Sequence, residues 1–315
     1  MRNGMPRLAR TVPTLARRPA VGGSGAGLAD LLDRARLEVL PTPGTADRVA
    51  EHVAPGRMIT VTASPSRGLE PTVVLSCELA GLGYDAVPHL AARMVGDAAE
   101  LTEIVARLTE AGITRVFVPS GDAARAGDYP GAVALLSELS RLGSPFPHVG
   151  VTGYPESHAS ISDEATIQAM WDKRRHATEM VSNMSFDPQV VATWLSRVRD
   201  RGVALPLWVG VPGPLDTAKL LTIAGRIGVG DSTRFLLTHR RTALRLATPG
   251  GFSTERFLRR LAPTLLRSDA IVAGLHLFTF NQIAETETWR RRLVTDLREG
   301  SRPRHPRGGL RHPTA

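Results

Sequence analysis

The chain has 315 residues, of which 42% are hydrophobic and 22% are charged, which is ordinary for a soluble folded protein and excludes a largely disordered chain. Its formal charge of +9 would suit a nucleic-acid-binding protein, but nine arginines in residues 1–26 and 301–315, which hold no acid, account for the whole excess. Residues 27–300 are formally neutral. We therefore expect two disordered basic tails and no binding of nucleic acid or membrane.

The cysteine content and the apolar runs indicate where the protein works. Cys77 is the only cysteine, which excludes an internal disulfide and favours a reducing, cytoplasmic compartment. No run approaches the roughly 18 apolar residues that a membrane span needs. The glycine-rich residues 23–27 follow an Arg/Pro-rich tail instead of a strand and are interpreted as linker, so the predicted domain spans 28–300 between tails 1–27 and 301–315.

Eight short apolar runs predict β-strands that alternate with amphipathic helices. In chain order, the predicted strands are residues 36–40, 58–63, 85–88, 115–119, 148–152, 180–184, 207–211 and 274–278. The predicted helices are residues 28–34, 46–53, 72–82, 98–111, 131–142, 164–177, 188–201 and 215–227, and Asp97 and Asp187 stand at cap positions. Residues 231–267 are expected to form two or three further helices.

Such alternation implies parallel crossover units, and eight of them favour a single-domain (β/α)8 TIM barrel. A doubly wound sheet would need a glycine-rich phosphate turn after its first strand, and none is present.

Polar or ionisable residues repeatedly follow the predicted strands. In a TIM barrel the catalytic groups lie at the carboxyl ends of the strands, so this arrangement predicts an enzyme. The residues concerned are Glu38, Thr62, His89, Asp122, Tyr154, Glu156, His158, Asn183 and Asn281. Common metal-binding and nucleophile motifs are absent, and no metal is expected.

Glu38 and Asp122 are the strongest candidates for catalysis. Glu38 interrupts the apolar strand Leu37-Glu38-Val39-Leu40, where burial should raise its pKa. A raised pKa is what a general acid needs near neutral pH. Asp122 follows Gly121, which would permit close approach of the backbone to a ligand, although a turn-capping role for Asp122 is equally plausible from the residues alone.

The order of seven segments resembles that of methylenetetrahydrofolate reductase over about residues 36–283. The most specific are Tyr154-Pro-Glu-Ser-His158 and Pro88-His89-Leu90. The other segments are Glu38-Val-Leu-Pro-Thr, Thr60-Val-Thr62, Ser120-Gly121-Asp122, Asn183-Met-Ser-Phe186-Asp187 and Leu277-Phe278-Thr-Phe-Asn281.

The resemblance implies reduction of 5,10-methylenetetrahydrofolate to 5-methyltetrahydrofolate with NADH or NADPH. Glu38 would protonate the folate amine, opening the five-membered ring to an iminium cation that accepts hydride. Asp122 would stabilise the developing positive charge. Asn183, which stands where the family has a pterin-contacting glutamine, would bind the substrate together with Phe186 and Phe278.

The resemblance also implies an FAD site. Its flavin-contacting positions would be Thr62, His89, Gly121, Tyr154, His158, Arg174 and Arg175, the two arginines being suited to a diphosphate. However, the family's Arg-Gly-Asp is Ser120-Gly121-Asp122 here, and the segment before Asn183 is about three residues shorter. Direct transfer of hydride from the nicotinamide to folate, without flavin, is therefore an alternative.

Two other functions remain open from the sequence. One is a folate-dependent methyltransferase or demethylase, and the other is a folate- or flavin-binding barrel without turnover. The sequence does not distinguish NADH from NADPH, and it leaves a homo-oligomer open.

Overall fold

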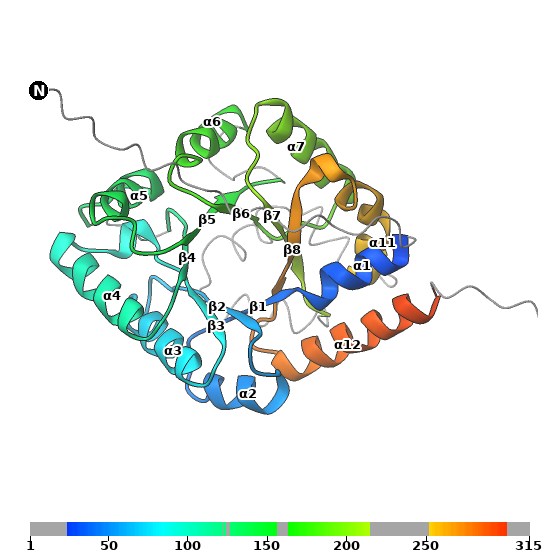
Figure 1. Ribbon diagram of the computed structural model, residues 1–315, viewed down its shortest axis with the longest axis horizontal. Coiled ribbons are helices and arrows are strands. Elements are labelled where there is room, and N and C mark those ends of the chain that lie inside the picture. Colours follow the sequence, from blue (N-terminus) through cyan, green and yellow to red (C-terminus); the bar gives the residue numbers. More distant parts are fainter. Residues whose placement is uncertain (1–23, 122, 124–126, 156–162, 215–251, 301–315) are drawn as a thin grey trace, which may run out of the picture.

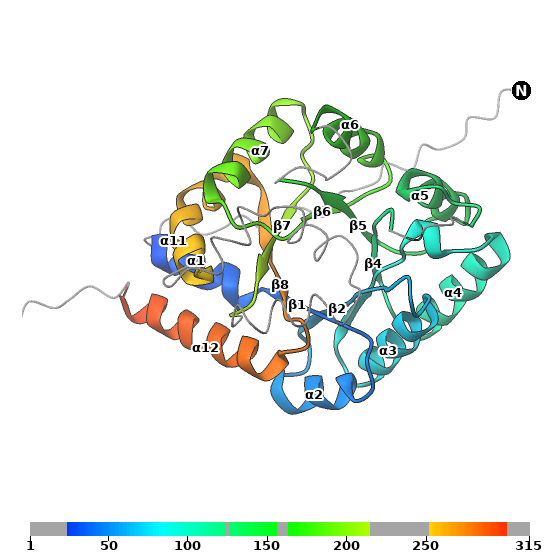
Figure 2. The ribbon, with the colours of Figure 1, turned by 180° about the vertical axis from the view of Figure 1, so that it is seen from behind.

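A computed structural model describes residues 24–121, 123, 127–155, 163–214 and 252–300. Eight parallel strands form a nearly closed barrel inside a ring of helices, seen from its two ends in Figures 1 and 2. The predicted (β/α)8 TIM barrel is therefore confirmed. The strands are β1 (Arg36–Val39), β2 (Met58–Val61), β3 (Asp85–Pro88), β4 (Arg115–Val118), β5 (His148–Gly153), β6 (Glu179–Ser182), β7 (Leu207–Pro212) and β8 (Val272–Phe278).

The strand order is β3-β2-β1-β8-β7-β6-β5-β4, so the first and last strands of the chain pair with each other. In that pair, Arg36 stands opposite His276 and Glu38 opposite Phe278. The barrel closes between β3 and β4, where the isolated parallel bridge between His89 and Phe117 takes the place of an assigned ladder. This seam is extended by a hydrogen bond of 2.8 Å from Leu90 N to Phe117 O.

Helices cover the outer face of the barrel (Figure 1). They are α1 (Ser24–Asp33), α2 (Thr45–His52), α3 (Glu70–Gly81), α4 (Ala98–Glu110), α5 (Ala132–Arg141), α6 (Asp163–Lys173), α7 (Pro188–Asp200), α11 (Thr254–Leu265) and α12 (Ile283–Gly300), with the short 3-10 helices η1 (Ala92–Met94) and η2 (Ser268–Ala270). The predicted caps are confirmed, because the side chains of Asp97 and Asp187 accept hydrogen bonds from backbone N–H groups in the first turns of α4 and α7.

The structure corrects the predicted start of the first helix. Residues 24–27, interpreted as linker, form the first turn of α1. Gly27 lies so close to the Leu266 side chain that a Cβ there would come within 2.7 Å of it, so the small residue permits close packing beside α11. Helix α12 was not predicted. The predicted helix over 215–227 lies outside the described residues.

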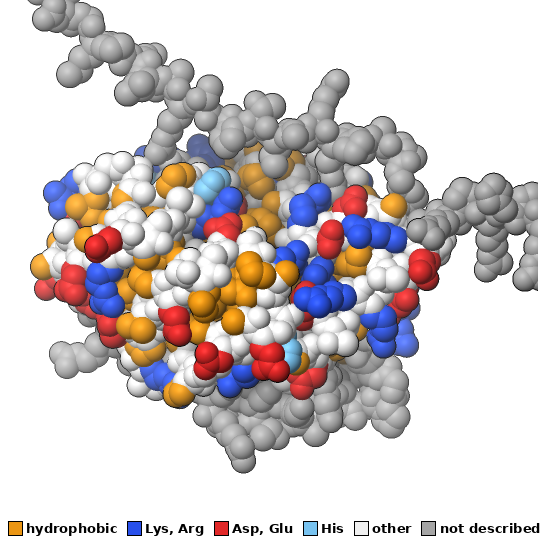
Figure 3. All heavy atoms as spheres, turned by 60° about the horizontal axis from the view of Figure 1, so that its bottom comes forward, with side chains coloured by type: hydrophobic (Ala, Val, Ile, Leu, Met, Phe, Trp, Pro, Cys, Tyr) orange, Lys and Arg blue, Asp and Glu red, His pale blue; other side chains and the backbone are white. Residues whose placement is uncertain are grey.

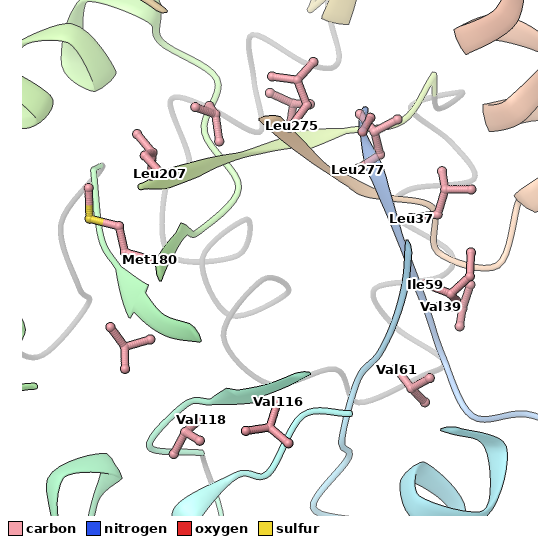
Figure 4. Packing of buried hydrophobic residues seen from close by; sticks show 14 of the residues in the cluster. Leu37, Val39, Ile59, Val61, Val116, Val118, Met180, Leu207, Leu275 and Leu277 are labelled. Carbon is pink, nitrogen blue, oxygen red and sulfur yellow. The ribbon is translucent and has the colours of Figure 1, made fainter. Parts of the chain in front are cut away.

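Two apolar cores hold the barrel together. Alternate strand residues such as Leu37, Ile59 and Leu277 lie on the outer face and pack beneath the helices (Figure 4). Inside the barrel, a smaller cluster consists of Val87, Phe117, Val181 and Trp208. Inward-facing glycines make room for its large rings. A Cβ at Gly274 would lie 2.6 Å from the Trp208 ring, and one at Gly150 would lie 3.1 Å from Phe117.

The outer surface carries mixed charge. Figure 3 shows acidic and basic side chains interspersed with apolar ones over the face that it presents. Among the described residues, no helix is both long enough and apolar enough to cross a membrane.

Candidate active site

A cavity lies at the carboxyl ends of the strands, where catalytic groups were expected. Its lining combines carboxylate, imidazole, amide and aromatic groups from both halves of the barrel. Six predicted site residues contribute to it: Glu38, Thr62, His89, Gly121, Asn183 and Phe278. The fold therefore brings together residues that are up to 240 positions apart in the chain.

Glu38 provides the only carboxylate among the described lining residues. Its side chain is 15% exposed, and its Oε2 lies 2.9 Å from His276 Nε2 and 3.7 Å from His89 Nε2. Burial raises the pKa of Glu38, while the nearby His89 and Arg36 oppose that increase. The direction agrees with the prediction from the sequence and suits a group that gives up a proton near neutral pH.

Hydrogen bonds from the loop after β8 fix the backbone around Glu38. Thr279 Oγ1 donates to Glu38 O at 2.6 Å. The Asn281 amide accepts from Leu40 N at 2.8 Å and donates to Leu40 O at 3.1 Å. Asn281 is itself in the left-handed region, with a φ of 60°. Asn281 was named in the sequence analysis as a polar residue that follows the last strand. Its side chain joins the loops that follow β1 and β8.

His89 follows β3, two strands away from β1, and its side chain also lies near Glu38. It is 6% exposed and packs edge-on against Phe117, with ring centroids 4.7 Å apart. Its Nε2 is buried and has no hydrogen-bond partner. Burial lowers the pKa of His89 to about 4 despite the opposing influence of Glu38, so its ring is neutral at neutral pH.

Below Glu38, the barrel interior contains a buried ionic cluster that sequence reasoning missed. Arg36 is fully buried; its Nη1 donates to Glu179 Oε1 at 2.8 Å and its guanidinium lies 4.5 Å from the centre of the Trp208 ring. Trp208 Nε1 donates to the other Glu179 oxygen at 2.9 Å. His276 connects the cluster to Glu38, since Arg36 Nε donates to His276 Nδ1 at 2.9 Å.

The sequence contains a signal that could have indicated this cluster. Arg36 and Glu38 are two residues apart, as are His276 and Phe278, which is the spacing of side chains on one face of a strand. Arg36, Glu38 and His276 interrupt apolar runs at this spacing, so they could have been assigned to the barrel interior.

Other predicted site residues do not line the cavity. Phe186 packs edge-on against Phe252 at a centroid distance of 5.1 Å, and Tyr154, which follows β5, is absent from the lining. Asp122 and His158 lie outside the described residues, although Gly121 beside Asp122 reaches the cavity.

The structure does not bring Arg174 and Arg175 to the cavity. They follow the last turn of α6, which returns the chain to the start of the next strand, so they lie at the amino-terminal end of the barrel. There Thr178 N donates to Val149 O at the beginning of β5. The Arg174 guanidinium lies 3.3 Å from the centre of the Trp171 ring.

Comparison with known protein families tests the resemblance that was seen in the sequence motifs. The sequence model of the family described as methylenetetrahydrofolate reductase matches residues 45–228, more than half of the chain. The chain belongs to the methylenetetrahydrofolate reductase family. Its family is therefore one of folate-related oxidoreductases. Strands β1 and β8, which carry Glu38 and His276, lie outside the matched residues.

Two solved structures show only a weak similarity to this member of the methylenetetrahydrofolate reductase family. A candidate phosphonomutase from Burkholderia cenocepacia J2315 is 12% identical, with a TM-score of 0.44, over 89% of this chain and 99% of that one. A 2,3-dimethylmalate lyase of the PEP mutase/isocitrate lyase superfamily is 10% identical, with a TM-score of 0.47, over 92% of each chain. At these values neither similarity bears on the chemistry.

The methylenetetrahydrofolate reductase family implies FAD, so the fit of the described residues to that group can be tested. A diphosphate needs cations or a cluster of backbone N–H groups. No arginine or lysine is among the described residues that line the cavity. The nearby Arg93 donates to the carbonyls of Ala123 and Pro130. The described lining therefore does not supply the cationic side chains that would fit the diphosphate of FAD.

Proposed function

We propose that this protein reduces 5,10-methylenetetrahydrofolate to 5-methyltetrahydrofolate, with NADH or NADPH as the source of hydride. The observation that carries the proposal is the Glu38 carboxyl, whose pKa is raised by burial at the base of the cavity, in a chain of the methylenetetrahydrofolate reductase family. The cytoplasm, where folates and nicotinamide nucleotides are both available, is the proposed compartment.

Glu38 is the proposed general acid. Its proton passes to an amine nitrogen of the folate as the carbon–nitrogen bond of the five-membered ring breaks, which leaves an iminium cation. Hydride from the nicotinamide then adds to the iminium carbon, which becomes the methyl group while the nicotinamide is oxidised. Glu38 regains a proton from solvent before the next cycle.

Other residues have proposed roles around the same reaction. Asn183 and Phe278 line the cavity and are suited to the edge and face of a pterin ring. Thr62, His89 and Gly121 lie on the side of β2, β3 and β4 and would contact the nicotinamide. Roles for Asp122 as electrostatic stabiliser, and for Phe186, Tyr154 and His158 as further contacts, rest on the sequence resemblance alone.

No step of this proposal passes through a flavin, because the described lining supplies no cationic side chain for the diphosphate of FAD. An absorption spectrum of the purified protein tests this part. We expect no flavin bands, together with NAD(P)H oxidation that depends on methylenetetrahydrofolate. A yellow protein that loses activity when the flavin is removed would contradict direct transfer.

Substitution Glu38→Gln tests the assignment of the acid. The amide has nearly the same shape but no acidic proton, so we expect NAD(P)H oxidation with methylenetetrahydrofolate to fall by at least about 100-fold, the lower range for general acid catalysis. Circular dichroism and folate binding should stay close to those of the wild type. Retained turnover would reject the role of Glu38.

A further inference from the structure

His276 is held between two groups that together determine where its proton lies. It is 1% exposed, with Arg36 Nε 2.9 Å from its Nδ1 and Glu38 Oε2 2.9 Å from its Nε2. A guanidinium can only donate hydrogen bonds, so Nδ1 must accept and cannot carry a proton. The proton of the neutral ring is therefore on Nε2, from which it is donated to Glu38.

The charged groups around His276 keep it in this form. Arg36 is fixed from the other side by Glu179, which also accepts from Trp208 and lies 3.9 Å from Arg115 Nη1. Burial, followed by the positive charge of Arg36, lowers the pKa of His276 well below its usual value. Protonation would place an N–H group of His276 against the Arg36 N–H, so the ring stays neutral over the pH range in which enzymes work.

This arrangement makes the two oxygens of Glu38 unequal. Oε2 is occupied by the hydrogen bond from His276 and has His89 Nε2 3.7 Å away. Oε1 has no hydrogen-bond partner among the described residues, and the side chain lines the cavity. When Glu38 is protonated, its proton is therefore favoured on Oε1, because a proton on Oε2 would compete with the hydrogen bond from His276.

We propose that Arg36 and His276 are positioning residues that direct the acidic proton of Glu38 onto Oε1, toward the substrate. This inference rests on the proposed function of Glu38 as general acid. His276 donates to the oxygen that becomes more negative as Glu38 releases its proton, so their hydrogen bond strengthens during proton transfer. Arg36 acts through His276 and touches no reacting atom.

The tautomer can be measured without any assay of activity. Nitrogen NMR spectra of protein labelled with ¹⁵N in histidine, recorded from about pH 5.5 to 8.5, should show one ring with Nε2 protonated and Nδ1 unprotonated throughout, since a neutral ring held by these partners does not titrate. Loss of that signal in His276→Gln assigns it. A His276 ring that titrates in this range, or that carries its proton on Nδ1, would overturn the proposal.

The pH dependence of kcat tests the function of the pair. Activity that depends on protonated Glu38 falls as pH rises through the pKa of that group. His276→Leu removes a donor to the carboxylate, so the falling limb should move to higher pH by about 1 to 2 units, the shift that corresponds to one charge-assisted hydrogen bond. The maximum kcat should fall roughly tenfold.

His276→Gln is the matched variant, because its amide can still donate to Glu38. We expect its falling limb to lie within about half a unit of the wild-type position, against one to two units for the leucine variant. A leucine variant that folds and has an unchanged pH profile would show that His276 is only structural and would overturn the proposal. If the wild type does not reduce methylenetetrahydrofolate, the proposed function fails, while the NMR result still decides the tautomer.

Discussion

Two glutamates inside the barrel have opposite pKa shifts because their neighbours differ. Burial acts on both to raise the pKa. At Glu179, the charge and hydrogen bond of Arg36 and the hydrogen bond of Trp208 outweigh burial and bring the pKa below its usual value. At Glu38, the opposing contributions of His89 and Arg36 are too small to do so. One carboxylate therefore neutralises a buried arginine, while the other retains an acidic proton.

The raised pKa of Glu38 leads to a prediction about stability. The folded state holds the proton of Glu38 more tightly than the unfolded chain, so stability falls as pH rises from the unfolded pKa, about 4.5, through the higher folded pKa. At higher pH the buried carboxylate remains a cost. Glu38→Gln removes this cost, so the inactive variant should melt at a higher temperature than the wild type at about pH 8 and at a similar temperature near pH 4.

Calorimetric melts of both proteins at the two pH values check this prediction. Equal melting temperatures at about pH 8 would show that the carboxylate is not under electrostatic strain. The measurement is independent of which substrate the enzyme uses.

At the scale of elements, glycines set how closely β6 and β7 approach at the site. A Cβ on Gly210 would lie 2.3 Å from Ser182 O and 2.8 Å from Asn183 O, both backbone atoms that cannot move without displacing the strand. Gly210 N also donates to Ser182 Oγ at 2.8 Å, which is a second contact between the two strands. The position of Asn183 at the cavity therefore depends on Gly210.

Gly210→Ala should weaken folate binding and destabilise the protein by roughly 1–3 kcal/mol, the usual cost of forcing extra atoms into a packed interior. Urea unfolding and folate titration measure the two effects. Gly81→Ala is the matched control, because Gly81 lies in α3 with nothing within 4 Å of its Cβ position. That variant should be neutral or slightly stabilising, and equal effects of the two substitutions would contradict the role of Gly210.

The elements could largely be predicted from the sequence, because each strand is a short apolar run between polar or turn residues. The predicted strand 85–88 matches β3, and the predicted helix 98–111 differs from α4 by one residue. The resemblance placed Arg174 and Arg175 at the cofactor, whereas in the structure they follow α6, and residues that follow a barrel helix lie at the end opposite the carboxyl ends of the strands.

The contacts of the site were harder to predict. His276 stands in an apolar run and is separated from Arg36 by 240 residues, so only the pairing of β1 with β8 shows that they touch. Glu38 could be identified because a lone acid in an apolar strand is unusual. Its hydrogen-bond partner could not be identified in the same way, because a histidine in a strand is common in protein cores.

For the whole molecule, the seam between β3 and β4 is the least connected part of the barrel wall. It has the isolated bridge at His89 and Phe117, whereas β7 and β8 pair over six positions. Backbone hydrogen bonds with few neighbours open at a lower free energy. The amide of Leu90, which donates to Phe117 O across the seam, should therefore exchange with deuterium faster than that of Leu277 in β8.

Hydrogen exchange followed by mass spectrometry, with peptides that cover β3 and β8, measures this difference. We expect at least about a tenfold difference in exchange rate, which corresponds to a difference in opening free energy of about 1.4 kcal/mol. Uniform protection around the barrel would contradict a weak seam.

The place of His89 gives the seam a consequence for ligand recognition. One residue both fastens the barrel wall and borders the hollow that receives the reactants. A ligand that packs against the His89 ring would stabilise the contact between β3 and β4. Closing this seam would then cost part of the binding free energy of the ligand. Ligand binding and closure of the seam between β3 and β4 are thereby thermodynamically linked. A tightly bound reactant should therefore slow amide hydrogen exchange at the seam more than elsewhere in the barrel.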